Sequence, residues 1–185
     1  MELSIGARRL ELKIGDITLE AVDAIGNAAN AALRGGGGVD GAIHAAAGPG
    51  LLDELRRRYP NGTPTGTAVV TDGHDLAARW VIHAVGPVWR GGGQGEPTLL
   101  EDAYRSVLER ADGLGARSLA LPAISMGSYG YPADEGARIG VETAAGHLGG
   151  ARTTLELVRF VLRPATLEAF STAVASFRMG SAETR

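Results

Sequence analysis

The sequence predicts an α/β fold: a three-layer α/β/α sandwich, in which helices cover both faces of a mixed or mostly parallel central sheet. Short, continuously apolar segments, typical of strands covered on both faces, alternate with segments whose apolar residues recur at helical spacing. Hydrophobic residues make up 44% and charged residues 21% of the 185 residues, as in ordinary globular proteins. This length suits one domain, so we expect residues 1–180 to form a single domain and 181–185 a flexible tail.

Apolar segments of strand length recur along the chain. In order, the expected strands are Arg9–Ile14, Ala24–Asn27, Ala68–Thr71, Trp80–Val85, Ser118–Ala123 and Leu155–Leu162. Glycine-bearing loops, Gly26–Gly38 and Ile124–Pro132, follow two of them. Because ligands of open α/β sheets bind beyond the carboxyl ends of the strands, we expect these two loops to face each other across one cleft.

Helical spacing marks the segments between and after the strands. In order, the expected helices are Gly38–Ala47, Pro49–Tyr59, Pro97–Leu114, Ala133–Leu148 and Ala165–Phe177. In the third, Leu100, Ala103 and Val107 are among the apolar residues that recur every three or four positions. The second begins with a proline, which favours the first turn of a helix. The glycine-rich segment Gly91–Gly95 is expected to be flexible.

Charge and composition exclude several classes of function. The net charge of −3, with no basic run longer than Arg56–Arg58, argues against a general nucleic-acid-binding face, although backbone amides can still bind an anionic ligand. The count of 0 cysteines excludes disulfides, cysteine-based zinc sites and a thiol nucleophile. The histidines lack metal-ligand spacing, so we expect no metal and no cofactor. With no signal peptide or membrane-spanning stretch, we expect a cytoplasmic protein.

Four consecutive glycines, Gly35–Gly38, lie between an expected strand and an expected helix. Glycine lets the backbone approach a ligand closely, and the first N–H groups of the helix carry partial positive charge. The loop therefore predicts a diphosphate site, with a flexible linker as the alternative. Gly36, Gly38 and Gly41 also spell G-x-G-x-x-G. No strand directly precedes them and no acidic residue ends a second strand, so a Rossmann-type dinucleotide site is disfavoured.

Polar residues flank this loop on both sides. Asp40 and His44 are four residues apart, so a helix places both on one face. There Asp40 could orient a water or a ribose hydroxyl with His44 holding it, or Asp40 could only cap the helix and His44 be an ordinary histidine. Asn27 and Asn30 suit ribose hydroxyls or turn chemistry. Spacing alone leaves these alternatives open.

Several motifs stand in the order and spacing of one family. They are GDIT (Gly15–Thr18), DAIGNAAN (Asp23–Asn30), GGGGVDGAIHAAAGP (Gly35–Pro49), VIHAVGP (Val81–Pro87) and PAISMGSYGYP (Pro122–Pro132). From about Leu10 to Phe170 the chain resembles the macrodomain family, and its glycine loop resembles the MacroD-type branch. The resemblance implies that residues 1–180 are a single macrodomain.

The resemblance also assigns roles to residues. Asp16 would accept a hydrogen bond from the adenine amino group beside the Ile17 backbone, where a turn or helix cap is the alternative. Asn30 would contact the distal ribose, and Asn27 belongs to the implied ligand-binding set. The loop residues implied along the diphosphate are Gly36, Gly37, Gly38 and Val39 from the first loop and Ser125, Met126, Gly127 and Ser128 from the second. Tyr129 would stack near the distal ribose, or simply pack. The implied catalytic set is Asp40, His44 and Asn30.

The chain departs from the family pattern at some positions. Gly26 stands where the family usually has valine, and we expect it to loosen the end of the strand. Met126 replaces a threonine, which removes a hydroxyl from the second loop. Leu162 and Arg163 take the place of an aromatic residue, so adenine would rest on an aliphatic surface or under a guanidinium plane.

The resemblance implies a function. We expect the protein to bind ADP-ribose, to hydrolyse mono-ADP-ribose from acidic side chains of modified proteins, and to deacetylate O-acetyl-ADP-ribose. The alternative is a non-catalytic ADP-ribose-binding reader, but a reader has no need for the pair of Asp40 and His44. The expected partners are ADP-ribose or an ADP-ribosylated protein. No membrane partner is expected, nucleic acid is expected only as an ADP-ribosylated end, and the protein is expected to be a monomer.

Overall fold

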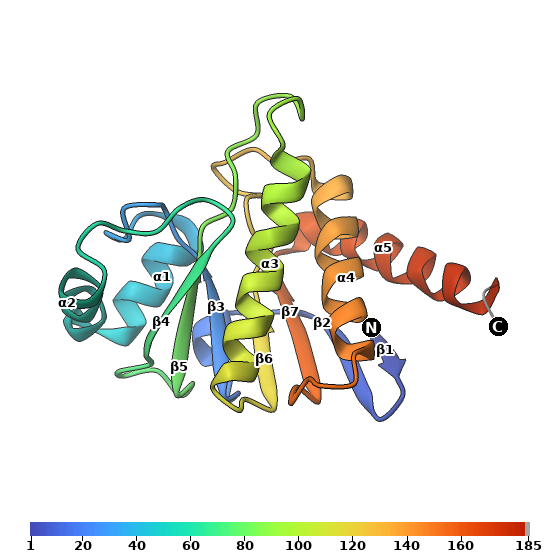
Figure 1. Ribbon diagram of the computed structural model, residues 1–185, viewed down its shortest axis with the longest axis horizontal. Helices are drawn as coiled ribbons and strands as arrows, with labels where there is room; N and C mark the ends of the chain where they lie inside the picture. Colours follow the sequence, from blue (N-terminus) through green and yellow to red (C-terminus); the bar gives the residue numbers. More distant parts are fainter. Residues whose placement is uncertain (184–185) are drawn as a thin grey trace.

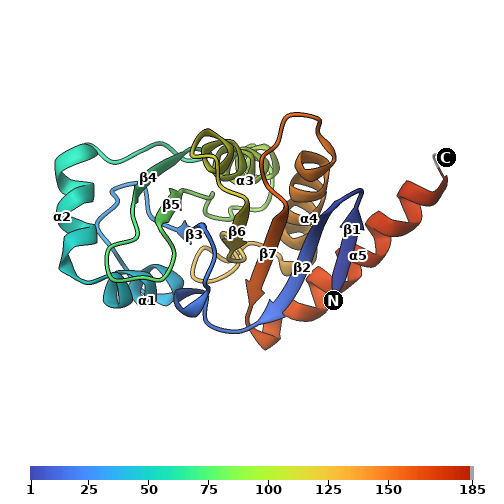
Figure 2. The same cartoon turned by 90° about the horizontal axis from the view of Figure 1, so that it is seen from below.

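The computed structural model describes residues 1–183, with side chains described up to residue 180. Within these residues the chain forms a seven-stranded sheet in the order β1-β2-β7-β6-β3-β5-β4 (Figures 1 and 2). The strands are β1 (Glu2–Ile5), β2 (Arg8–Ile14), β3 (Ala24–Ala28), β4 (Ala68–Asp72), β5 (Trp80–Ala84), β6 (Ser118–Leu121) and β7 (Leu157–Leu162). The five central strands run parallel, and the edge strands β1 and β4 are antiparallel to their neighbours. The predicted mixed sheet is confirmed.

Helices cover both faces of this sheet. They are the short 3₁₀ helix η1 (Ile17–Leu19) and the α-helices α1 (Gly38–Ala47), α2 (Pro49–Arg58), α3 (Glu96–Gly113), α4 (Ala133–Gly149) and α5 (Pro164–Glu183). Viewed from below, α1 lies on one side of the central strands and α3 and α4 on the other (Figure 2). The two larger of the three apolar clusters follow the same division, since Ile25 and Val81 pack with α1 whereas Ile82 and Leu119 pack with α3 and α4. The three-layer sandwich is therefore confirmed.

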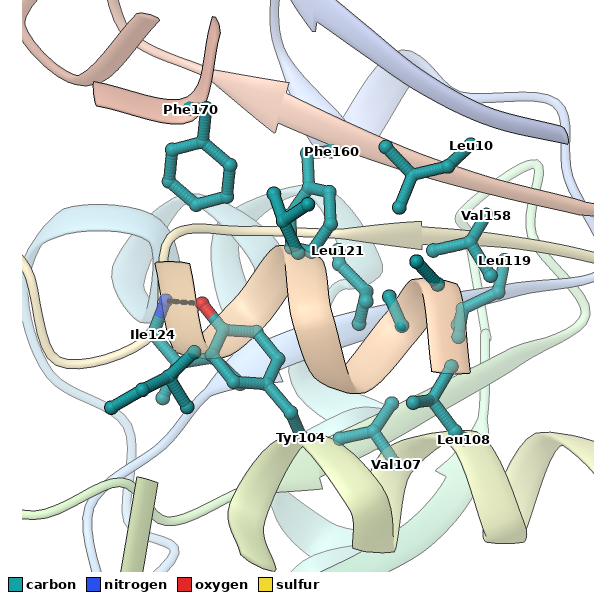
Figure 3. Packing of buried hydrophobic residues seen from close by; sticks show 14 of the residues in the cluster. Leu10, Tyr104, Val107, Leu108, Leu119, Leu121, Ile124, Val158, Phe160 and Phe170 are labelled. Carbon is teal, nitrogen blue, oxygen red and sulfur yellow. Dashed lines mark hydrogen bonds between the residues drawn. The ribbon is translucent and has the colours of Figure 1, made fainter. Parts of the chain in front are cut away.

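The larger core cluster holds three aromatic rings in contact. Phe160 of β7 meets Tyr104 of α3 edge-on at 6.0 Å between ring centroids, and Phe170 of α5 at 4.8 Å (Figure 3). Such pairs favour tilted contacts because the ring edge is positive and the face negative. The Tyr104 hydroxyl also accepts a hydrogen bond of 3.0 Å from the backbone N–H of Ile124, just beyond β6. The core thus reaches the base of the second loop.

Two expected features of the chain differ in the structure. Gly26 lies inside β3, and a Cβ there would come 2.9 Å from Leu121 Cδ2, so the missing side chain lets β6 pack closely and does not loosen the strand. The Gly91–Gly95 segment is held by the carboxylate of Glu96. That carboxylate accepts hydrogen bonds from the backbone N–H groups of Arg90, Gly92 and Gln94 at 2.6–3.2 Å. A loop expected to be flexible is therefore folded around one buried acid.

The ends of several elements differ by a few residues from the predicted ends, and the strand β1 was not predicted. The strand β6 ends at Leu121 because Pro122 has no N–H for the ladder, and β7 begins at Leu157 rather than Leu155. The helix α5 continues to Glu183 and extends away from the body of the molecule (Figure 1). It enters the predicted tail at 181–185, whose last two residues lie outside the described part. Within the described residues, no helix has the length and apolarity needed to cross a membrane.

Candidate functional site

A cleft of about 580 Å³ opens at the carboxyl ends of β3, β6 and β7. The two glycine-bearing loops both line it, as expected for loops that follow neighbouring parallel strands. Most of the predicted site residues lie in its wall: Asp16, Ile17, Asn30, Gly36, Gly37, Gly38, Val39, Asp40, Ser125, Met126, Gly127, Ser128, Tyr129, Leu162 and Arg163. Asn27 and His44 lie outside the wall, beneath Asp40.

The first loop is anchored and ends in a helix whose start lines the cleft. Asn30 donates a hydrogen bond of 2.7 Å to the carbonyl oxygen of Gly35, and Gly35 and Gly38 take positive φ angles. The helix α1 begins at Gly38, and its N-cap, Gly37, supplies no side-chain hydrogen bond to the first N–H groups. Because these N–H groups have no partner within the helix, they can bind an anion. The anchoring argues against the flexible-linker alternative.

Asp40 lies in the first turn of α1 and is 5% exposed. Its Oδ1 accepts a hydrogen bond of 2.7 Å from Asn27 Nδ2 and lies 3.4 Å from His44 Nε2. The N-cap of the helix is Gly37, so Asp40 does not serve as the cap. A nearly buried carboxylate with one oxygen held from below is placed to orient a group in the cleft.

Asn27 and His44 support this carboxylate from beneath. Asn27, which we expected among the ligand-binding residues, is 0% exposed and donates to Asp40 instead of facing the cleft. The ring of His44 lies beside Gly35, where a Cβ would be 3.7 Å from it. Asn27 therefore holds Asp40 in position, and His44 contacts both Asp40 and the glycine loop.

Asp16 stands at the opposite end of the cleft with Ile17, Leu162 and Arg163. Its Oδ1 accepts hydrogen bonds from the hydroxyl (2.7 Å) and the backbone N–H (2.9 Å) of Thr18, and these bonds lower the pKa of Asp16. Asp16 therefore caps η1 and also lines the cleft as an ionised acceptor. The two roles expected for Asp16, a helix cap and an acceptor for a ligand, are therefore compatible.

The second loop crosses the cleft in a constrained conformation. Ser125 is 6% exposed with a φ angle of 66°, and its carbonyl oxygen accepts the N–H of Tyr131 at 3.0 Å. Tyr129 is half-buried, and its carbonyl oxygen accepts the N–H of Trp89 at 2.9 Å. The side chain of Met126 reaches the start of α4, where a Cβ on Gly136 would lie 2.9 Å from Cε. The residue that replaces threonine here thus packs against the protein core.

Sequence reasoning missed several residues that shape this cleft. His83 and Gly86 both belong to the motif VIHAVGP, but the motif alone assigns neither of them a role. A histidine inside a continuously apolar strand signals a buried polar contact, and this was the usable clue. No signal pointed to Thr71 or Tyr104. Among the side chains that the structure describes, residues 1–180, no three His, Asp or Glu gather as a metal site requires.

The chain is similar in sequence and in structure to characterised proteins. The family model for the Macro domain matches residues 26–140. An O-acetyl-ADP-ribose deacetylase of Salmonella gallinarum is 56% identical over 139 residues, which are 74% of this chain and 78% of that protein.

Solved structures share the whole fold. The Oceanobacillus iheyensis macrodomain with ADP superposes with a TM-score of 0.91 at 38% identity, covering 97% of both chains. The Trypanosoma brucei macrodomain in complex with ADP-ribose gives a TM-score of 0.82 at 38% identity, covering 89% of this chain and 68% of that one. A family model that spans most of the chain and a relative of this identity both support the same assignment: the chain belongs to the macrodomain family.

Proposed function

We propose that this macrodomain binds ADP-ribose in the cleft and hydrolyses its derivatives. The substrates are mono-ADP-ribose linked to acidic side chains of proteins, and O-acetyl-ADP-ribose. One observation carries the proposal: the Asp40 carboxylate, 5% exposed, stands in the cleft wall at the start of α1 with one oxygen held by Asn27. A module that only reads ADP-ribose requires the phosphate loops but no such carboxylate.

The dimensions and chemistry of the cleft fit ADP-ribose along its length. A volume of about 580 Å³ lies within the range of small-molecule sites. Asp16 offers an acceptor to the adenine amino group, and the uncapped start of α1 faces the second loop where a diphosphate would lie. The distal ribose then falls between Asn30, Asp40 and Tyr129.

Hydrolysis of the protein-linked form requires one water molecule. The water attacks the anomeric carbon of the distal ribose, and the bond from that carbon to the side-chain oxygen breaks. The bonding pair leaves with the carboxylate, and the products are ADP-ribose and the free acidic side chain. Asp40, or a phosphate of the ligand, positions the water, and the loops hold the diphosphate so that the ribose stays in place.

The acetylated substrate uses the same positioned water. The water attacks the acetyl carbon, and the bond from that carbon to the ribose oxygen breaks. The bonding pair stays on the ribose oxygen, which takes up a proton from the water, and acetate is released. The relatives support binding and deacetylation, because a relative at 56% identity is named an O-acetyl-ADP-ribose deacetylase and structural neighbours are complexes with ADP or ADP-ribose.

The test is the substitution Asp40→Ala. We expect turnover of both substrates to fall by about 10²–10⁴-fold, the usual contribution of a positioned acid or base, while ADP-ribose still binds in isothermal titration calorimetry. Asp53→Ala, which removes an exposed carboxylate of α2, is the matched control and should keep full activity. Unchanged turnover in Asp40→Ala would exclude the catalytic role. Binding without turnover in the wild type would identify a reader.

We further propose that the protein acts in the cytoplasm as a monomer. The net charge of −3 disfavours general nucleic-acid binding, so an ADP-ribosylated nucleic-acid end is the one nucleic-acid substrate we consider. Light scattering after size-exclusion chromatography should give a mass near 19.0 kDa, and a doubled mass would contradict the monomer.

A further inference from the structure

A row of buried polar side chains runs beneath the cleft from β4 to α1. Thr71 of β4, His83 of β5 and Asn27 of β3 are each 0% exposed. The row joins Thr71 Oγ1 to His83 Nε2 at 2.9 Å, His83 Nδ1 to Asn27 Nδ2 at 3.1 Å, and Asn27 Nδ2 to Asp40 Oδ1 at 2.7 Å. Of these residues, Asp40 alone lines the cleft. Buried polar groups destabilise a core unless they are paired, so the row requires an explanation.

The chemistry of the amide determines which nitrogen of His83 carries the hydrogen. Asn27 Nδ2 carries two hydrogens and accepts none, so both atoms that it contacts must be acceptors. The Nδ1 of His83 is therefore without a hydrogen. In a neutral ring the hydrogen is then on Nε2, which donates to the hydroxyl of Thr71.

Asp40 sets the direction in which the amide of Asn27 points, and His83 supports it. Among residues 1–183, Asn27 Oδ1 has no hydrogen-bond partner although it is buried, so the two bonds of Nδ2 determine the orientation. Turning the amide by 180° would bring its oxygen against Asp40 Oδ1, a carboxylate oxygen that can only accept. In this orientation the second hydrogen of Nδ2 is accepted by His83 Nδ1, and this bond stabilises the arrangement in which Asn27 donates to Asp40.

The surroundings keep His83 neutral. Burial and then the nearby His44 lower the pKa of His83 to about 3, although Asp40 and Glu54 act in the opposite direction. A protonated ring would direct an N–H at the N–H of Asn27 and break the row.

We propose that His83 is a positioning residue for the reaction, acting on Asp40 through Asn27. The row holds Asp40 Oδ1 through the hydrogen bond from Asn27. The other oxygen, Oδ2, lies toward Gly36, which lines the cleft. A Cβ on Gly36 would be 3.2 Å from Oδ2. With one oxygen fixed, the other keeps the angle needed to orient a water. This inference rests on the hydrolase activity proposed above.

Two variants of His83 test the contributions of its two ring nitrogens separately. The side-chain oxygen of asparagine is two bonds from Cβ, as Nδ1 is, so His83→Asn can keep the acceptor for Asn27. His83→Gln places its polar atoms where Nε2 was and loses that acceptor. We expect kcat to fall about tenfold in His83→Gln and to recover largely in His83→Asn, with KM and the Kd for ADP-ribose unchanged in both because His83 is outside the cleft. His147→Gln, on the far helix α4, is the control.

A second measurement does not depend on activity. The ¹⁵N spectrum of the imidazole nitrogens should show His83 with a bare Nδ1 and a hydrogen on Nε2 at every pH from 5 to 8. If the His83 variants do not fold, Thr71→Val, with Thr71→Ser as its control, tests the same row through kcat. A hydrogen on Nδ1, or equal kcat in His83→Gln and wild type, would overturn this role alone. Absence of wild-type turnover would overturn the hydrolase and this role together.

Discussion

At the scale of single residues, Gly86 shows how a missing side chain shapes the cleft. A Cβ at this position would lie 2.2 Å from Ser125 Oγ and 2.5 Å from Ile124 Cγ2. Gly86→Ala should therefore displace the second loop, lower the free energy of unfolding by about 1–3 kcal/mol and weaken ADP-ribose binding. Urea unfolding and calorimetry measure the two effects. Gly113→Ala at the end of α3 is the control because no atom lies within 4 Å of its Cβ. Wild-type affinity in Gly86→Ala would show that the loop accommodates the methyl group.

Site residues with a local sequence signal could be predicted, whereas a contact between strands distant in the chain could not. Asp40 and the glycine loop could be found because helical spacing and consecutive glycines are local signals. The contact of Asn27 with His83 could not, because the two residues face each other across β3 and β5, far apart in the chain. A single sequence does not give the register of parallel strands. Asn27 was therefore predicted as a ligand contact when it is a support for Asp40.

At the scale of elements, α4 holds the second loop indirectly through α3. A Cβ on Gly140 would lie 3.0 Å from Tyr104 Cζ, and the Tyr104 hydroxyl binds the N–H of Ile124. Gly140→Ala should lower the free energy of unfolding by about 1 kcal/mol, since the ring must move. Gly146→Ala, in the same helix but exposed with open space around it, should raise stability by up to about 1 kcal/mol. Equal stabilisation by both changes would show that the two helices are not tightly packed there.

Element prediction succeeded where one physical signal dominated. The central strands are buried on both faces, so their apolar runs stand out, and proline marks the start of α2 and α5. The strand β1 was missed because it is a short edge strand of mixed polarity, held by pairing with β2 after a turn at Gly6. The glycine-rich segment before α3 was expected to be flexible because composition does not reveal that the carboxylate of Glu96 binds its N–H groups.

At the scale of the whole molecule, the sheet brings the site together and also buries a titratable group at its centre. His83 sits in β5 with 0% exposure, facing His44 and Asp40 of α1, Glu54 of α2 and the uncharged Asn27 and Thr71. Burial, then His44, lowers the pKa of His83 from 6.5 to about 3 in the folded state. Between these pH values the unfolded chain binds a proton that the folded protein does not. The free energy of unfolding must therefore fall as the pH drops below 6.5.

Measuring unfolding at several pH values tests this on the intact protein. From pH 7.5 to pH 5, His83 alone should remove roughly 2 kcal/mol, because its folded pKa lies well below that window. Glu54 and Glu20 are carboxylates whose pKa values are lowered from 4.5. The stability that they contribute is therefore lost only at a pH below this window. His83→Asn cannot titrate, and every other group is shared with the wild type. The difference in unfolding free energy between wild type and His83→Asn should thus shrink by that amount on acidification. A constant difference would mean that the interior does not exclude the proton from His83.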